Sequence, residues 1–212
     1  MREPFFSVIV PAHNAEAFMR LGLDSIRNQS WTDDELIVVC DRCTDDTERI
    51  ARTYTDKVIV TDFGLDGLAR NAGIDAARGK YILFMDHDDW FLHEFVFAQI
   101  ADTMKRIPDA DVLLLSFIWK GVGYIDQRKN RYIAVWCKCW KRVFIGITRF
   151  SDRPYWSDVD FDRKAFAKGP RVYAKDIPAI YYNYMMPGSI SWRQDQGQIE
   201  SFAEQEKRGA GK

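Results

Sequence analysis

The sequence predicts an α/β fold in which a mostly parallel sheet is flanked by helices. In the first half of the chain, short apolar segments alternate with segments of helical periodicity, and the connections between them are short. Hydrophobic residues make up 47% of the 212 residues, which is enough for a sizeable core. Together these observations indicate βαβ units wound around one sheet.

The expected elements follow from apolar runs and helical spacing. The expected strands are residues 5–10, 36–40, 58–61, 81–85 and 111–119, and the expected helices are residues 15–28, 46–54, 67–78, 94–106 and 158–168. Gly79 is the expected C′ residue of the third helix. Residues 121–131 are expected to form a loop or hairpin, residues 171–184 are strand-rich, and residues 132–150 receive no assignment.

The overall composition narrows the class of protein. The formal net charge is -1, which provides no electrostatic argument for a nucleic-acid partner. The four cysteines fit neither a disulfide framework nor the usual spacing of a zinc site. Because there is also no signal-peptide pattern and no apolar run long enough to span a membrane, we expect a cytoplasmic protein.

Three carboxylates, those of Asp86, Asp88 and Asp89, follow the expected strand at residues 81–85. A packed core does not absorb three ionised carboxylates unless a cation meets them. If the chain stays extended, Asp86 and Asp88 lie on the same side, and such a pair suits Mg²⁺ or Mn²⁺. The alternative is a solvated, Asp-rich turn.

Other polar residues also fall just after expected strands, namely residues 11–14, Asp41, and Arg70 on the following helix. In a doubly wound sheet these positions converge at the carboxyl ends of the strands, where ligands bind. Neither the dinucleotide-binding glycine motif nor a P-loop is present. A carboxylate, an arginine and a metal-binding carboxylate pair together suit a nucleotide diphosphate.

Five segments occur in a characteristic order over about the first hundred residues: SVIVPAHN, DSIRNQS, ELIVVCDRCTDDT, LARNAGI and GKYILFMDHDDW. This order resembles the family 2 glycosyltransferases with the GT-A fold. A weaker resemblance to bacterial lipopolysaccharide and capsule members continues through VWCKCWKR, DVDF and IYYNY followed by GSIS. The resemblance implies a nucleotide-sugar-binding half at residues 1–108, an acceptor-side half of the same domain at 109–192, and a polar tail at 193–212 that we expect to fray.

The resemblance implies a base pocket lined by Pro11, Ala12 and His13, with Asp41 accepting the imide N–H of uracil. His13 could instead be a polar loop residue, and Asp41 could merely cap the next helix. One departure from the family lies here, because the usual DDGS motif reads Cys40-Asp41-Arg42-Cys43 and places a bulky cation near the nucleotide.

The resemblance also implies how charge is balanced in the site. Arg70 would offset the diphosphate, Asp88 would bind the metal, and Asp86 would lie nearer the ribose or the waters of the metal. On its own, an arginine on a helix more often pairs at the surface with a nearby acid such as Asp66 or Asp75.

The base implied by the resemblance is Asp158, which would take the proton from the acceptor hydroxyl. It falls where the family has a Glu-Asp motif, although Ser157 replaces the glutamate. Other nearby acids stay open as alternatives: Asp152, Asp160 and Asp162.

The implied function is a metal-dependent, inverting glycosyltransferase that moves one sugar from a nucleotide-sugar, most simply a UDP-sugar, to an acceptor hydroxyl. The acceptor would be a glycan or lipid-linked molecule in cell-surface glycan synthesis. The QxxRW motif of processive synthases is absent, which favours single-sugar transfer. The alternatives are a catalytically degenerate nucleotide-sugar-binding protein or accessory subunit and, less favoured, a sugar nucleotidyltransferase, whose glycine-rich basic loop is missing at residues 11–16.

Residues 128–149 mix basic and aromatic side chains. This segment could form a face that contacts an anionic membrane peripherally. The alternative, which we favour slightly, is a segment with its aromatic residues in the core and its cations in water.

Overall fold

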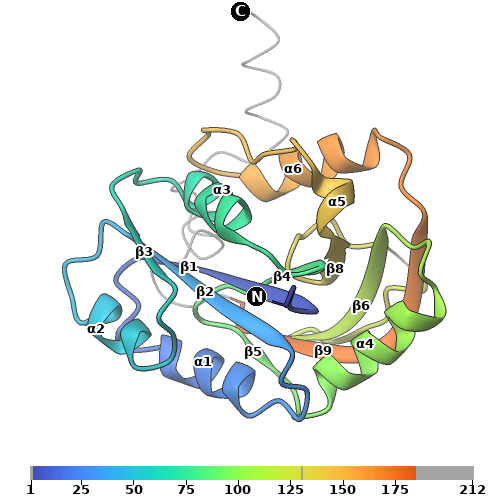
Figure 1. Ribbon diagram of the computed structural model, residues 1–212, viewed down its shortest axis with the longest axis horizontal. Helices are drawn as coiled ribbons and strands as arrows, with labels where there is room; N and C mark the ends of the chain where they lie inside the picture. Colours follow the sequence, from blue (N-terminus) through green and yellow to red (C-terminus); the bar gives the residue numbers. More distant parts are fainter. Residues whose placement is uncertain (1, 130, 185–212) are drawn as a thin grey trace, which may run out of the picture.

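The computed structural model describes residues 2–129 and 131–184, which form one curled sheet between two layers of helices (Figure 1). The strands are β1 (Phe6–Ala12), β2 (Asp34–Asp41), β3 (Val58–Thr61), β4 (Tyr81–Phe84), β5 (Trp90–Phe91), β6 (Val112–Trp119), β7 (Gly123–Ile125), β8 (Lys138–Lys141) and β9 (Val172–Tyr182). The helices are α1 (Met19–Arg27), α2 (Thr47–Arg52), α3 (Asp66–Ala76), α4 (Val96–Arg106), α5 (Arg142–Ile145) and α6 (Ser157–Phe166). Helices α1, α2 and α4 cover one face of the sheet, and α3, α5 and α6 cover the other.

The strand order is β3-β2-β1-β4-β8-β6-β9-β5, and β7 forms a hairpin with β6. β1 pairs in parallel with β2 and β4, and β2 pairs in parallel with β3, as the predicted βαβ units require. β8 is antiparallel to both β4 and β6, and so joins the first part of the sheet to the second. The predicted α/β fold class is confirmed.

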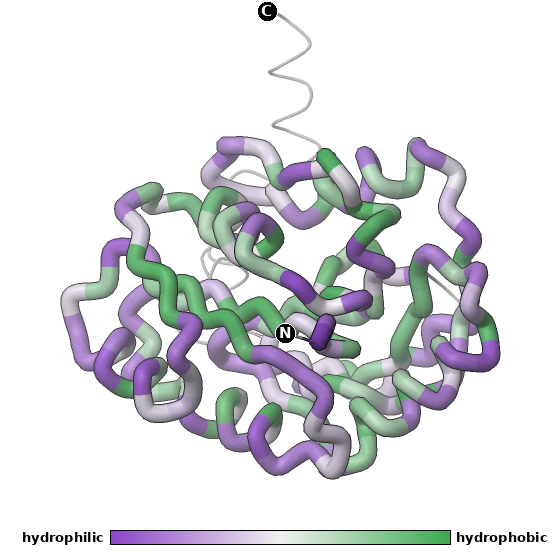
Figure 2. Tube along the Cα trace, in the orientation of Figure 1, coloured by the Kyte–Doolittle hydropathy of each residue, from purple (hydrophilic) through white to green (hydrophobic). Residues whose placement is uncertain are grey.

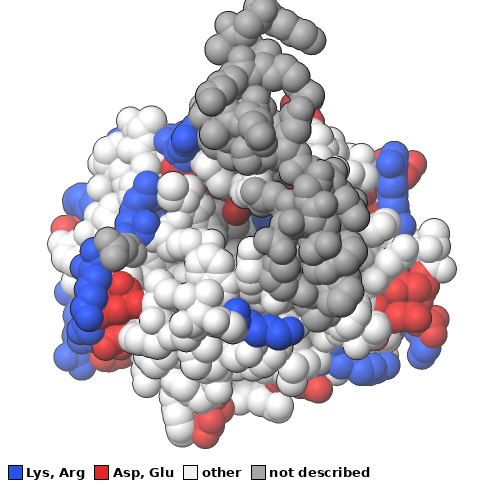
Figure 3. Space-filling model, turned by 180° about the vertical axis from the view of Figure 1, so that it is seen from behind, with Lys and Arg blue, Asp and Glu red and all other residues white. Residues whose placement is uncertain are grey.

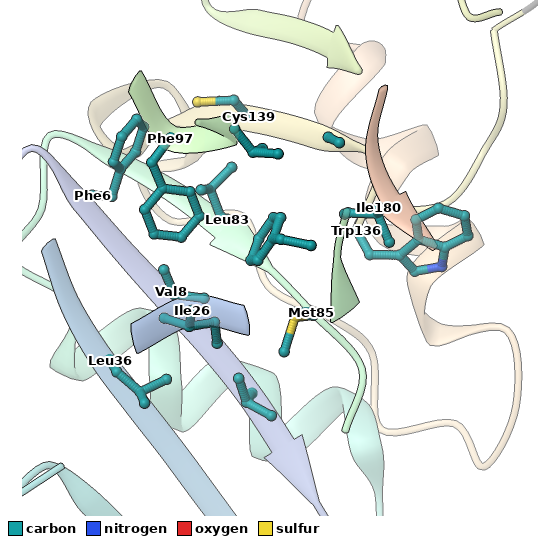
Figure 4. Packing of buried hydrophobic residues seen from close by; sticks show 14 of the residues in the cluster. Phe6, Val8, Ile26, Leu36, Leu83, Met85, Phe97, Trp136, Cys139 and Ile180 are labelled. Carbon is teal, nitrogen blue, oxygen red and sulfur yellow. The ribbon is translucent and has the colours of Figure 1, made fainter. Parts of the chain in front are cut away.

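The central strands supply two separate cores, because successive side chains of a strand point to opposite faces. On β1, Phe6 and Val8 belong to the core on the α1 and α4 face, whereas Ile9 belongs to the core beneath α3 and α6. Figure 4 shows Phe6 and Val8 packed with Ile26 of α1 and Phe97 of α4. Figure 2 shows hydrophobic residues concentrated along the strands and hydrophilic residues on the outer turns.

Most expected elements are confirmed, with their ends shifted by a few residues. The unassigned segment at residues 132–150 contains β8 and α5. The role expected for Gly79 is wrong, because α3 ends at Ala76 and Gly79 instead lies against the backbone of Phe6 and Ser7, where a Cβ would come within 2.5 Å. The tail at 193–212 and the GSIS motif at 188–191 lie outside the described residues.

Strand pairing brings the carboxyl ends of β1, β2 and β4 together. Ala12 is the register partner of Cys40, Asp41 is the partner of Thr61, and β4 ends at Phe84 opposite Ile9 of β1. We call this region the carboxyl end of the sheet. The polar residues predicted to bind a nucleotide-sugar follow these strand ends.

Glu35 joins several segments at the opposite end of the sheet. Its buried carboxylate accepts hydrogen bonds from Ser7 Oγ (2.5 Å) and from the backbone N–H groups of Arg78 (2.6 Å) and Gly79 (3.1 Å), and it pairs with Lys57. Burial alone would raise the pKa of Glu35, but the hydrogen bonds from Lys57, Ser7 and Arg78 outweigh burial and lower it. The ionised form therefore stabilises the fold.

We expect Glu35→Gln to lower the free energy of unfolding at pH 7 by about 2 kcal/mol, because charge-assisted hydrogen bonds are lost. Since the folded-state pKa is lowered, this contribution is complete above the ordinary glutamate pKa of about 4.3 and is lost as the pH falls through the folded-state value. Urea denaturation of wild type and variant at pH 7 and near pH 3 measures both effects. Glu3→Gln, at an exposed ion pair with Arg142, is the control, and an equal cost at both pH values would contradict the assignment.

Candidate active site

The loop between β4 and β5 carries the carboxylates that follow the fourth strand. Oδ1 of Asp86 accepts a hydrogen bond from Nη2 of Arg70 at 2.7 Å. Burial raises the pKa of Asp88, the nearby His87 opposes this rise, and the charge of Asp86 adds to it. A cation next to Asp88 would offset both the burial and the repulsion.

Asp89 is the buried acid of this loop, and it binds the loop to the segment that follows β9. Its Oδ1 accepts a hydrogen bond from the backbone N–H of Asn183 at 2.8 Å, just after β9, whereas Oδ2 has no partner within the described ranges. Burial raises the pKa of Asp89 well above its ordinary value, and the charges of Asp86 and Asp88 add to the rise. Gly22 of α1 lies so close that a Cβ would come within 2.6 Å of the Asp89 carbonyl oxygen. The carboxylate loop is therefore held between α1 and β9.

Arg70 of α3 is buried between carboxylates, with a side chain that is only 6% exposed. It pairs with Asp66 one turn earlier and with Asp86, and its Nε has no partner in the described part of the chain. Burial alone would lower the pKa of Arg70, but the charges of Asp66, Asp86 and Asp158 outweigh burial and raise it. The expected pairing with Asp66 is present, yet in the interior rather than at the surface.

Asp158 lies in the first turn of α6, which begins directly after a strained residue. Trp156 precedes the helix with φ 63, in the left-handed region that bulky residues rarely occupy. Burial raises the pKa of Asp158 to about 6, the charge of Arg70 opposes the rise, and the charges of Asp66 and Asp86 add to it. A carboxylate with this pKa is suited to accepting a proton near neutral pH.

The start of α6 is fixed against α3. Oγ of Ser157 donates a hydrogen bond to Oδ1 of Asp66 at 3.1 Å. Gly67 allows this approach, because a Cβ at that position would meet Cβ of Ser157 at 2.8 Å. Asp66 thus connects the helix of Asp158 with the helix of Arg70.

The other acids considered as the base have different surroundings. Asp160 pairs with Lys164 one turn later, at 2.6 Å. Asp162 is fully buried and pairs with Lys138 and Arg131. Asp152 is exposed. Asp158 differs from them in that the charges of both Arg70 and Asp86 act on its carboxyl group.

Asp41 and His13 lie at the ends of β2 and β1. The carboxylate of Asp41 accepts hydrogen bonds from Thr61 Oγ1 (2.9 Å) and from the backbone N–H groups of Phe63 (2.7 Å) and Leu65 (3.1 Å). It therefore orders the loop before α3 and does not cap α2. Nδ1 of the exposed His13 ring lies 2.7 Å from the carbonyl oxygen of Asp41. Because a carbonyl oxygen only accepts, this contact requires the proton on Nδ1.

The altered DDGS segment also turns toward this loop. Arg42 has φ 52, a left-handed conformation, and its Nε donates a hydrogen bond to Oδ1 of Asp62 at 2.6 Å. Its guanidinium lies over Gly64, where a Cβ would meet Nη1 at 2.3 Å. The bulky cation expected near the nucleotide is therefore paired with the loop that Asp41 holds.

The basic and aromatic segment at 128–149 does not form one face among its described residues. Trp136, Lys138 and Trp140 are buried. Three arginines of the segment pair with acids: Arg131 with Asp162, Arg142 with Glu3, and Arg149 with Asp75. On the face seen in Figure 3, basic and acidic side chains lie next to each other near its margins. The arrangement matches the alternative in that Trp136 and Trp140 enter the core, but it differs in that the cation of Lys138 is buried rather than in water.

The oxygen ligands available for a metal at this site are the carboxylates of Asp86 and Asp88. Asp86 already carries the hydrogen bond from Arg70, which leaves Asp88 as the less neutralised group. Within residues 2–129 and 131–184, no group of three or more His, Cys, Asp or Glu side chains is arranged to hold a metal ion. An ion at this loop would depend on oxygen atoms from another source, such as phosphate or water. The four cysteines are free thiols.

Comparison with known families identifies the chain. The family model described as glycosyl transferase family 2 matches residues 7–170, which include every site residue discussed above except Asn183. The chain belongs to glycosyl transferase family 2. No helix in the described part of this family 2 chain is long and apolar enough to cross a membrane.

Two curated relatives come from Bacillus subtilis (strain 168). EpsH is 31% identical over 176 residues, which cover 71% of this chain and 51% of EpsH. EpsJ is 41% identical over 133 residues, which cover 60% of this chain and 36% of EpsJ. The family 2 chain thus spans about half the length, or less, of these curated relatives.

Solved structures agree on the fold. S. aureus TarS 1-349 in complex with UDP-GlcNAc has a TM-score of 0.74 and 25% sequence identity, covering 83% of this chain and 57% of that chain. A mannosyltransferase of Pyrobaculum calidifontis, PcManGT, in complex with GDP-Man and Mn²⁺ has a TM-score of 0.71 and 17% identity, covering 93% and 62%. The fold is that of the GT-A glycosyltransferases, as the resemblance implied.

Two long-range contacts of this family 2 site were not predicted from the sequence. Asp89 was noted as an acid, but its hydrogen-bond partner Asn183 lies 94 positions away along the chain. Ser157 was noted only as a replacement, whereas it donates to Asp66 across 91 positions. Such long-range contacts leave no local pattern, although the four-residue spacing of Asp66 and Arg70 on a helix does signal that pair.

We expect Arg70→Met to lower the free energy of unfolding by about 3 kcal/mol, because it leaves the half-buried carboxylates of Asp66 and Asp86 without their buried cation. Thermal and urea denaturation measure this loss. Arg49→Met is the matched control, since Arg49 pairs with Asp46 at an exposed position and its loss should leave stability unchanged. Equal stability of the two variants would show that Arg70 does not offset the charge of the cluster.

Proposed function

We propose that this chain is a metal-dependent, inverting glycosyltransferase that moves one sugar from a UDP-sugar to an acceptor hydroxyl. The observation that carries the proposal is the proximity of Asp158, which has a raised pKa, to Arg70 and Asp86 at the carboxyl end of the sheet. These positions belong to different elements, α6, α3 and the loop after β4. A solvated, Asp-rich turn has no reason to collect a buried arginine and a further half-buried acid.

In the proposed reaction the acceptor oxygen attacks the anomeric carbon of the donor sugar. Asp158 takes the proton of the acceptor hydroxyl while the bond between the anomeric carbon and the phosphate oxygen breaks. The electron pair of that bond leaves with the nucleoside diphosphate. A base that faces the leaving group across the sugar ring gives inversion in a single displacement, and a positioned base of this kind contributes about 10²- to 10⁴-fold.

Charge on the leaving group would be met by two groups. A divalent ion, Mn²⁺ or Mg²⁺, held by Asp88 and by Asp86 or its waters, would neutralise charge on the departing diphosphate. Arg70 would add to this field, although two of its three nitrogens already contact Asp66 and Asp86. We therefore assign Arg70 a larger part in holding the carboxylates than in binding phosphate directly.

The base pocket is proposed at Pro11, Ala12, His13 and Asp41. The exposed ring of His13 is free to stack on a base. Asp41 Oδ2 accepts one hydrogen bond, from Leu65 at 3.1 Å, and a carboxylate oxygen can accept more than one. Asp41 Oδ2 can therefore accept a second hydrogen bond, from the imide N–H of uracil. This contact would favour UDP over other nucleoside diphosphates. TarS, solved with UDP-GlcNAc, makes that sugar the first donor to test.

The acceptor half is proposed to use a glycan or lipid-linked hydroxyl in cell-surface glycan synthesis. The same proposal includes a division into donor and acceptor halves at residue 108 and a peripheral membrane contact at the cytoplasmic face, although the described part of residues 128–149 does not supply a basic face for that contact. The competing function is a nucleotide-sugar-binding protein without catalysis, which the altered DDGS and Glu-Asp motifs would allow. The raised pKa of Asp158 favours catalysis, since acids with perturbed pKa values are concentrated at catalytic sites.

We expect UDP with Mn²⁺ to raise the melting temperature by several degrees, because a ligand that binds only the folded state stabilises it. Asp88→Ala should abolish the Mn²⁺-dependent part of this shift, and GDP and dTDP should give smaller shifts. Asp102→Ala is the control, since this acid of α4 pairs with Arg106 at the surface. A shift of the same size in Asp88→Ala and wild type would reject the metal assignment.

We expect Asp158→Asn to reduce the release of UDP from UDP-GlcNAc, or from whichever UDP-sugar is turned over, by about 10²- to 10⁴-fold. UDP binding measured by thermal shift should persist, because Asp158 acts on the acceptor side. Asp160→Asn and Asp152→Asn are matched controls among the neighbouring acids. If turnover is lost in Asp160→Asn and retained in Asp158→Asn, Asp160 is the base. If the wild type binds UDP but turns over no UDP-sugar, the result supports a nucleotide-sugar-binding protein without catalysis.

A further inference from the structure

Lys138 of β8 is a charged residue with no contact to solvent. Its side chain is 0% exposed, and its Nζ lies 2.9 Å from Oδ1 of Asp162, as an ion pair rather than a directed hydrogen bond. The same Nζ donates hydrogen bonds to the carbonyl oxygens of Tyr132 (2.7 Å) and Ala134 (2.5 Å). One buried ammonium group thus connects β8, the segment before it, and helix α6.

Asp162 receives a second cation on its other oxygen. Its side chain is also 0% exposed, and Oδ2 pairs with Nη1 of Arg131. The guanidinium of Arg131 lies over the ring of Phe166, 3.8 Å from its centroid. Since Asp162 and Phe166 both belong to α6, the two cations hold the middle and the end of that helix.

A buried ion pair of this kind contributes little net stability to a fold. Removing two charges from water costs more than packing apolar residues of similar volume in the same space. What a buried pair gives in return is a fixed geometry, because an uncompensated charge is strongly unfavourable in any other arrangement. The helix held in this way carries Asp158 one turn before Asp162, on the side of Arg70.

Tyr132 provides a second connection between the Lys138–Asp162 ion pair and Asp158. Burial raises the pKa of Tyr132 to about 12, and the charge of Asp158 adds to the rise, as expected for neighbouring groups. The ring of Tyr132 packs against Phe117, Trp119 and Trp136. Lys138 therefore contacts the backbone of a residue near Asp158 and, through Asp162, the helix of Asp158 itself.

We propose that the Lys138–Asp162 ion pair is a positioning device that keeps Asp158 in register with Arg70 and with the segment of Tyr132. The inference rests on the proposed role of Asp158 as the base. Lys138 and Asp162 are positioning residues and do not touch the reacting atoms. Two anchors bracket Asp158 on its helix, Ser157 bonded to Asp66 before it and Asp162 after it.

The test compares Asp162→Asn, which keeps the shape of the side chain, with Lys138→Met. A misplaced base lowers the rate of the chemical step, so we expect kcat for UDP release from the donor to fall between about tenfold and a hundredfold. KM for the donor, and the melting-temperature shift with UDP and Mn²⁺, should stay within about twofold of wild type, because the donor half of the site is untouched. Arg131→Met, at a partly exposed position, should give a smaller loss of kcat.

Glu35→Gln separates positioning from general stability. Glu35 is also a buried, paired charge, but it lies at the opposite end of the sheet and contacts no residue of the site. All variants are assayed well below their melting temperatures, and Glu35→Gln should keep the kcat of wild type despite its lower stability. If Asp162→Asn and Lys138→Met lose no more kcat than Glu35→Gln, the positioning role is overturned.

Failure of the positioning role can be distinguished from failure of the proposed function. If Asp158→Asn turns over the donor as wild type does, the base assignment is wrong and the positioning role is overturned with it. If Asp158→Asn is inactive while Asp162→Asn and Arg131→Met keep full kcat, only the positioning role is overturned. Asp162→Asn and Arg131→Met decide the question even if Lys138→Met does not fold.

Discussion

The site depends on one buried cation among carboxylates. Arg70 pairs with Asp66 and Asp86 and offsets the charge of Asp158. Without it, acids contributed by α3, the β4–β5 loop and α6 would repel one another in a poorly solvated region. The arginine therefore determines that these three elements can meet at all, and it does so before any donor or metal is bound.

The pairing of Arg70 with these carboxylates also determines which roles are open to the other charged groups of the site. Because Arg70 pairs with carboxylates inside the protein, the proposed function requires a cation at Asp88 to meet most of the charge on a bound diphosphate. Within this loop Asp86 is paired with Arg70, whereas burial and the charge of Asp86 both raise the pKa of Asp88. Asp158, by contrast, is partly compensated by Arg70 and retains a pKa of about 6, which suits a group that must gain and release a proton.

Local patterns in the sequence predicted the first half of the chain well and the second half poorly. In β1, β2 and β4, nearly continuous apolar runs end in polar residues, which signals buried parallel strands and the ligand end of the sheet. Around β8 the sequence alternates aromatic and basic residues, because Lys138 is buried and paired while its neighbours pack into the core. A buried lysine looks like a solvent-exposed one in a sequence, so the strand had no recognisable pattern.

The same reasoning explains which site residues sequence analysis could place. Asp86, Asp88, Asp41 and His13 lie at or just after strand ends, so the fold class alone places them at the carboxyl end of the sheet. Asp158 depends on contacts made across the chain: Ser157 with Asp66, and Asp162 with Lys138. Its position is therefore encoded in pairs of distant charges and hydrogen-bonding groups rather than in a motif. Pairs of this kind bind α6 to helix α3 and to strand β8, in addition to the burial of Phe161 and Ala165 in the core beneath the helix. The buried charges supply the orientation that hydrophobic packing, being non-directional, does not provide.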